Sequence, residues 1–115
     1  MANPVVPRTA RELKRASAKH NAPIWARLAE YMLKPSSARR HINLKQVAHL
    51  TKAGDTVVFP GKVLGTGSIP HGITLYSFSI SVRALSKVRE AGGTIVTHDQ
   101  LISSNPTGRG VVLLG

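Results

Sequence analysis

The chain has 115 residues, and its 16 lysines and arginines against five aspartates and glutamates give a formal net charge of +11. It has no cysteine, which excludes disulfides, thiolate metal ligands and thiol nucleophiles. The longest uninterrupted apolar run, residues 111–114, is far shorter than the about 20 residues that span a bilayer. We therefore expect one soluble, cytoplasmic domain over residues 1–115, with no membrane association.

The positive charge is concentrated in the first half of the chain. Residues 1–53 hold 11 basic and two acidic side chains, whereas residues 54–115 hold five and three. A small domain with this much self-repulsion suggests a polyanionic partner that neutralises it. We expect that partner to bind mainly residues 1–53.

The first predicted helix carries a stripe of basic residues. Thr9 and Glu12 have the spacing of a capping box and predict a helix that runs to about His20. At about 100° per residue, four basic side chains share one face and Leu13 points to the opposite side. These four are Arg8, Arg11, Arg15 and Lys19. A solvated helix face is the ordinary alternative, but like charges three and four residues apart with few acidic partners favour phosphate binding.

Two more helices are predicted in the first half, separated by a basic loop. Pro23 suits a first helical turn, and Lys34, which precedes a proline, marks the end of that helix. Asn43 and Gln46 form a capping box for the next helix, which we expect Gly54 to end. Residues 36–41 read as an exposed loop that holds Arg39, Arg40 and His41. His41 could contact a phosphate when protonated, or be an ordinary solvated residue.

The second half has the pattern of an α/β fold. Short β-branched or aromatic runs predict strands at residues 56–59, 73–78, 94–96 and 111–114. Helices are expected between the second, third and fourth of them. This order predicts a layered α/β core over residues 54–115, with a parallel sheet covered on both faces and a basic helical half, residues 1–53, packed on it.

The glycine-rich residues 60–68 raise the question of a phosphate-binding loop. Their spacing matches neither the P-loop nor the dinucleotide fingerprint, which needs a glycine where Pro70 stands. We interpret them as a glycine turn that lets the backbone approach another surface, either of the protein itself or of a nucleic acid.

Residues suited to catalysis or metal binding are scarce. The five acids include no evident pair for acid/base work, and the histidines lack a His-x-x-x-His spacing. His98 and Asp99 are the only neighbouring histidine and acid, and Asp99 suits a helix N-terminus in any case. We expect no enzyme, no metal, no cofactor and no small-molecule substrate. The five aromatic residues fit core positions, which argues against a platform for stacking single-stranded bases.

Several motifs of this chain occur together in one known protein family. Residues 56–67, followed by residues 73–75, Phe78-Ser79 and Gly92-Gly93, are similar to the core signature of the archaeal and eukaryotic large-subunit ribosomal protein eighteen family, L-eighteen-e. That family shares this core with bacterial large-subunit ribosomal protein fifteen. In the first half, Trp25, Lys34-Pro35 and Asn43-Leu44 agree with the archaeal members.

The resemblance implies a non-catalytic constituent of the large ribosomal subunit in the cytoplasm. Such a protein binds large-subunit ribosomal RNA, packs against neighbouring ribosomal proteins and has a layered, irregular β-β-α type core. The glycines that match the family's signature loop are Gly61, Gly65 and Gly67. The expected rRNA-binding residues are Arg8, Arg11, Lys14, Arg15, Lys19, Arg27, Lys34, Arg39, Arg40, His41 and Lys62.

Two alternatives belong to other function classes. A general DNA- or nucleic-acid-binding protein of the chromatin type would have the same charge, because charge alone does not distinguish RNA from DNA. A small nucleotide-dependent enzyme would use the glycine-rich loop at residues 61–68.

Overall fold

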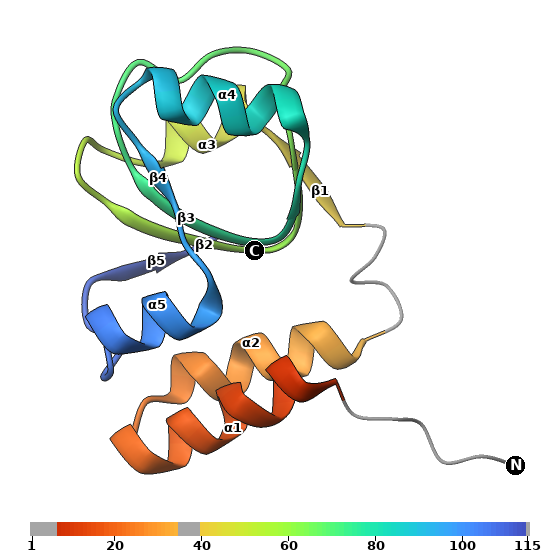
Figure 1. The fold of residues 1–115 in the computed structure, drawn as a ribbon, viewed down its shortest axis with the longest axis vertical. Coiled ribbons are helices and arrows are strands. Elements are labelled where there is room, and N and C mark those ends of the chain that lie inside the picture. Colours follow the sequence, from red (N-terminus) through yellow and green to blue (C-terminus); the bar gives the residue numbers. More distant parts are fainter. Residues whose placement is uncertain (1–6, 35–39, 115) are drawn as a thin grey trace, which may run out of the picture.

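The computed structural model describes residues 7–34 and 40–114, and within these ranges the chain forms five helices and five strands (Figure 1). In chain order they are α1 (Arg8–His20), α2 (Pro23–Leu33), β1 (His41–Asn43), α3 (Leu44–Leu50), β2 (Thr56–Leu64), β3 (Thr74–Ile80), α4 (Val82–Glu90), β4 (Thr94–Ile95), α5 (His98–Ser104) and β5 (Val111–Leu113).

All five strands belong to one parallel sheet centred on β2. β3 pairs with β2 along one edge, and β4 pairs with β3. The other edge of β2 is shared, because β5 pairs with residues 56–58 and β1 pairs with residues 62–64. The nine-residue strand β2 therefore pairs with β1, β3 and β5, and β4 joins the sheet through β3.

Helices cover both faces of the sheet, as the lack of strict alternation in the strands predicts. Val57 and Leu75 point into a buried cluster with α3 and α4, whereas Val58 and Tyr76 point into a second cluster with α1, α2 and α5. Figure 1 shows α3 and α4 on one side of the strands and α1, α2 and α5 on the other. The prediction of a layered α/β fold is confirmed.

The predicted start of the first helix is wrong by two residues, because a cap at Thr9 would start the helix at Ala10. α1 begins at Arg8, Pro7 is its N-cap, and no side chain caps it. Thr9 is already inside the helix, so its hydroxyl does not occupy the cap position. The Glu12 carboxylate instead bonds to Arg8 and to His98, a residue that lies far away in the sequence.

The capping predictions for the next two helices are confirmed, with one exception. Pro23 lies in the first turn of α2, and the backbone N–H of Asn43 donates to Gln46 Oε1 at 3.0 Å. Gly54, however, does not end α3. That helix ends at Leu50, and Thr51, in an extended conformation, donates its hydroxyl hydrogen to Val47 O at 2.8 Å.

Two segments that we interpreted as loops contain strand residues. His41 opens β1, and β2 continues through Gly61 and Lys62 to Leu64. The backbone N–H of Lys62 donates to Arg40 O at 2.9 Å. A Cβ at position 61 would lie 2.6 Å from that same oxygen, so a glycine is required for β1 to approach β2. Residues 36–39 of the predicted basic loop, Arg39 among them, lie outside the described residues.

Candidate nucleic-acid interface

The basic stripe of α1 faces away from the rest of the molecule. Ala10, Leu13 and Ala16 are the buried residues of this helix and pack toward α2 and the sheet. The predicted stripe is exposed on the opposite side, together with a further lysine. These exposed residues are Arg8, Arg11, Lys14, Arg15 and Lys19.

Only one of these five cations forms an ion pair within the described part of the chain. Arg8 Nε lies 2.9 Å from Glu12 Oε1, and the Arg8 side chain is 86% exposed. The hydrogen bond from His98, followed by the one from Arg8, lowers the pKa of the Glu12 carboxyl below its ordinary value. The other four cations are therefore available to an external anion.

A second basic group lies where α2 ends and β1 begins. Lys34 Nζ is 5.2 Å from the centre of the Tyr31 ring, and Arg40 Cζ is 4.7 Å from the same ring. Such cation–π contacts hold the cations at fixed positions. Lys34 and Arg40 therefore share the Tyr31 ring, and Lys62, which is exposed, donates its backbone N–H to Arg40 O. Tyr31 is half-buried under the two cations rather than inside the core.

Figure 1 shows that α1 and α2 run antiparallel, so the end of α2 lies beside the start of α1. Arg27 is exposed on α2, and His41 is exposed at the start of β1. The structure thus gathers most of the described rRNA-binding candidates on the α1/α2 side of the sheet.

The glycine loop after β2 is approached by the protein's own basic residues. Lys87 Nζ donates to Gly65 O and to Gly67 O, each at 2.6 Å. A Cβ at position 65 would lie 2.6 Å from Arg83 Cγ, and one at position 67 would lie 2.5 Å from Lys45 Cβ. The sequence left open whether this loop approaches the protein itself or a nucleic acid. The structure shows that it contacts the protein itself.

The same loop presents oxygens, whereas a phosphate-binding loop presents N–H groups. The carbonyl groups of residues 65 and 67 face the Lys87 ammonium, and Thr66 O accepts from the backbone N–H of Lys45 at 3.1 Å. This geometry gives no support to a nucleotide-dependent enzyme built on the loop.

Sequence analysis did not single out Lys45, Arg83 or Lys87. Arg83 and Lys87 are four residues apart on α4, so they share a helix face. That spacing is a signal that could have identified them. Lys45 is placed beside them only by the tertiary fold.

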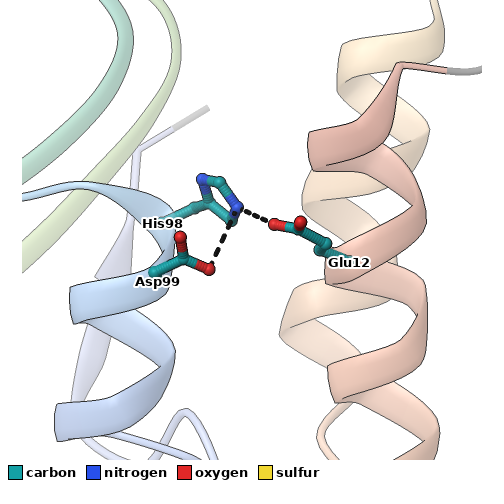
Figure 2. A group of neighbouring side chains, drawn as sticks. All are labelled: Glu12, His98 and Asp99. Atoms are coloured by element: carbon teal, nitrogen blue, oxygen red, sulfur yellow. Dashed lines mark hydrogen bonds and ion pairs between the residues drawn. The ribbon is translucent and has the colours of Figure 1, made fainter.

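One cluster of titratable residues joins α1 to α5, as Figure 2 shows. His98 Nε2 donates a hydrogen bond to Glu12 Oε2, and Asp99 Oδ1 lies 3.4 Å from the same nitrogen. Ligand atoms of the three residues lie within 4.8 Å of one another. A divalent cation could use them only if His98 lost the proton that it donates, and the hydrogen bond explains their proximity by itself.

A groove of about 570 Å³ lies along α3 and has no carboxylate in its lining. Its titratable residues are Lys45 and His49. An acid/base pair for catalysis is therefore absent from this groove. In the part of the chain that the structure covers, no helix combines the length and apolar character that crossing a membrane requires.

Comparison with known proteins agrees with the resemblance of the motifs. Residues 10–115 match the family model described as ribosomal protein 60S L18 and 50S L18e. The chain belongs to the L18/L18e family of ribosomal proteins. The match covers the basic helices and the sheet together, so membership of the L18/L18e family does not rest on the glycine loop alone.

Archaeal members of the L18/L18e family are similar over most of their length. The large ribosomal subunit protein eL18 of Methanococcus maripaludis is 36% identical over 112 residues, which cover 97% of this chain and 93% of the relative. The protein of the same name from Archaeoglobus fulgidus is 41% identical over 98 residues, or 85% and 84% of the two chains. That of Pyrobaculum aerophilum is 38% identical over 102 residues, or 89% and 84%.

Proposed function

We propose that this protein is a non-catalytic, structural constituent of the large ribosomal subunit and binds ribosomal RNA through its α1/α2 side. The observation that carries the proposal is the outer face of α1, where one of five exposed cations is ion-paired within the described residues. Membership of a ribosomal protein family supports it. Its partners would be large-subunit rRNA and neighbouring ribosomal proteins, in cytoplasmic ribosomes.

The binding mechanism follows from the charge and the side-chain types. Lysines and arginines that neutralise RNA phosphates release condensed counterions, and this release drives association. The planar guanidinium of arginine can also grip a phosphate with two parallel hydrogen bonds. Because Arg8, Arg11 and Arg15 lie on one helix face, they can contact successive phosphates along one strand.

RNA shape, rather than base identity, is the expected basis of recognition. Stacking on bases needs exposed aromatic rings, but Trp25, Phe59 and Tyr76 are buried and the Tyr31 ring is covered by two cations. Contacts to phosphates and sugars of an A-form helix do not require such rings.

The helix that carries the stripe is held in place before RNA binds. Leu13 is fully buried against α2, and Glu12 is bonded to His98 of α5. A preorganised surface avoids part of the entropy cost of binding. We therefore expect α1 to dock on RNA as a rigid element.

The proposal is tested by a salt titration of binding to large-subunit rRNA from Archaeoglobus fulgidus. If about six phosphates are neutralised, the logarithm of affinity should fall with the logarithm of salt concentration at a slope of about −4 to −5. The double variant Arg11→Ala/Arg15→Ala should make the slope shallower by about 1.4 to 1.8. The control Lys52→Ala/Arg89→Ala removes two exposed cations, one after α3 and one on α4, and should leave the slope closer to that of the wild type. A wild-type slope near zero rules out the electrostatic mechanism.

The alternative of a general nucleic-acid binder is tested by competition. Folded large-subunit rRNA should displace the protein from duplex DNA at concentrations at which duplex DNA does not displace it from rRNA. Equal affinity for the two would favour the chromatin-type function.

A further inference from the structure

A second set of cations lies on the side of the sheet away from α1. Lys45 of α3 and Arg83 and Lys87 of α4 converge on the loop at residues 65–67, and we call these three residues the α3/α4 cluster. The stem of Arg83 packs over the Gly65 backbone, and the Lys45 side chain packs over that of Gly67. Gly67 has a φ of +87°, which a glycine adopts without strain.

The three cations have different surroundings. The Lys87 ammonium is held by two carbonyl oxygens and fixes the loop, whereas the Lys45 and Arg83 side chains belong to exposed residues. Neither of these two forms an ion pair with a described acid. Glu90 of α4 borders the same small hollow as Lys87 and Ser68, but it is not ion-paired with Lys87 in the described structure.

The α3/α4 cluster and the α1 stripe face different directions. α3 and α4 pack on one face of the sheet, and α1, α2 and α5 pack on the other. The molecule measures 44 Å along its longest axis, and α4 and α1 lie toward opposite ends of that axis (Figure 1). An RNA helix docked on the α1 stripe would therefore leave the α3/α4 cluster uncovered.

We propose that Lys45 and Arg83 bind the phosphate backbone of a second RNA segment, so that the protein bridges two segments of ribosomal RNA across its sheet. This inference rests on the proposed function. Two unpaired cations beside a fixed loop suit an anionic backbone, and the packed stem of Arg83 reduces the entropy lost when its guanidinium binds. An acidic surface of a neighbouring protein is the competing occupant, which the experiment below distinguishes.

The absence of cysteine allows a site-directed RNA cleavage experiment on the whole chain. Exposed Ser68, next to the loop, and exposed Ala18, on α1, are each replaced to give Ser68→Cys and Ala18→Cys. Each thiol is labelled with tethered iron–EDTA, and the protein is bound to large-subunit rRNA from Archaeoglobus fulgidus. Hydroxyl radicals then cleave the RNA near each position, and primer extension maps the cuts.

We expect Ser68→Cys and Ala18→Cys to cleave two RNA segments that are not adjacent in the rRNA sequence. Adding Lys45→Ala/Arg83→Ala should reduce the Ser68→Cys cuts at least tenfold and leave those from Ala18→Cys unchanged. The matched control Lys52→Ala/Arg89→Ala removes two exposed cations outside the α3/α4 cluster and should leave the cuts from both cysteines unchanged. Circular dichroism checks that each variant is folded.

The outcomes separate this inference from the proposed function. Cleavage from Ala18→Cys without cleavage from Ser68→Cys would overturn the second RNA surface, in favour of a protein partner or none, and leave the proposed function standing. Cleavage of one and the same segment from both positions would overturn the bridge. Absence of cleavage from both would contradict the proposed function as well.

Discussion

His98 Nε2, in the first residue of α5, donates a hydrogen bond to the Glu12 carboxylate of α1, although 86 residues separate the two in the chain (Figure 2). The acceptor lies on the same helix as the cations proposed to bind RNA, and the donor lies on a helix that follows the sheet. This bond therefore fixes the orientation of the basic helix relative to the sheet by a polar contact in addition to apolar packing.

Replacing Glu12 with glutamine should reduce the loss of stability in acid. The ordinary pKa of the carboxyl is 4.5, and its hydrogen bonds to His98 and then Arg8 lower it. A carboxylate with a lowered folded-state pKa stabilises the fold above its unfolded pKa, and this contribution is lost as the pH falls through the folded value. Urea unfolding at a series of pH values between about 5 and 3 should show a steeper decline for the wild type than for Glu12→Gln. Parallel curves would contradict the assignment.

Replacing Tyr76 with phenylalanine should reduce the loss of stability in alkali. Burial raises the pKa of Tyr76 from 10.0 to about 12. Because the folded value is higher than the unfolded one, the stabilising contribution is complete below pH 10 and is lost as the pH rises toward 12. Wild type and Tyr76→Phe differ in one group only, so the difference between their curves isolates the phenol. Identical alkaline midpoints would show that the hydroxyl is solvated.

Truncating Leu28 should destabilise the protein strongly. This side chain is fully buried between α1 and the sheet face, so Leu28→Ala removes apolar contacts and leaves a cavity. The expected cost is about 2 to 5 kcal/mol of unfolding free energy. Leu50→Ala is the control, because Leu50 is 59% exposed and its truncation should cost under about 0.5 kcal/mol. Chemical denaturation measures both, and similar costs would mean that the two environments are misassigned.

Adding one methyl group at Gly61 should detach β1 from β2. The new Cβ would meet Arg40 O at 2.6 Å and Phe59 Cε2 at 2.7 Å, and neither a backbone carbonyl nor a buried ring can move freely. We expect Gly61→Ala to cost about 1 to 3 kcal/mol. Amide hydrogen exchange should show faster exchange at Lys62, whose N–H donates to Arg40 O, while the amides of α4 keep their protection. Unchanged exchange at Lys62 would refute the close packing.

Local sequence patterns predicted most of the helices and strands. Pro23 and the Asn43 and Gln46 pair mark helix starts by chemistry that acts within four residues, and the structure has helices at both. Thr9 and Glu12 have the spacing of a capping box, but they do not cap α1. The Glu12 carboxylate accepts a hydrogen bond from His98 of α5 instead, and local sequence does not reveal that partner.

The longer extent of β2 and the existence of β1 could not be predicted from local sequence. Pro60 and Gly61 favour a turn when taken alone, yet pairing with β1 and β3 keeps residues 60–64 in the sheet. The exposed face of α1 was predictable, because it depends only on helical periodicity. The α3/α4 cluster was not, because its members come from separate helices.

The pairing of β5 with β2 also has a consequence for folding during translation. Thr56 pairs with Val111, so the first half of this edge of β2 stays open while 55 further residues are synthesised. At about 5 to 20 residues per second this takes roughly 3 to 11 seconds. An open strand edge invites pairing with other nascent chains. Residues 1–53 emerge first with a large positive excess, so the charge proposed to bind RNA also makes unfinished copies repel one another during translation.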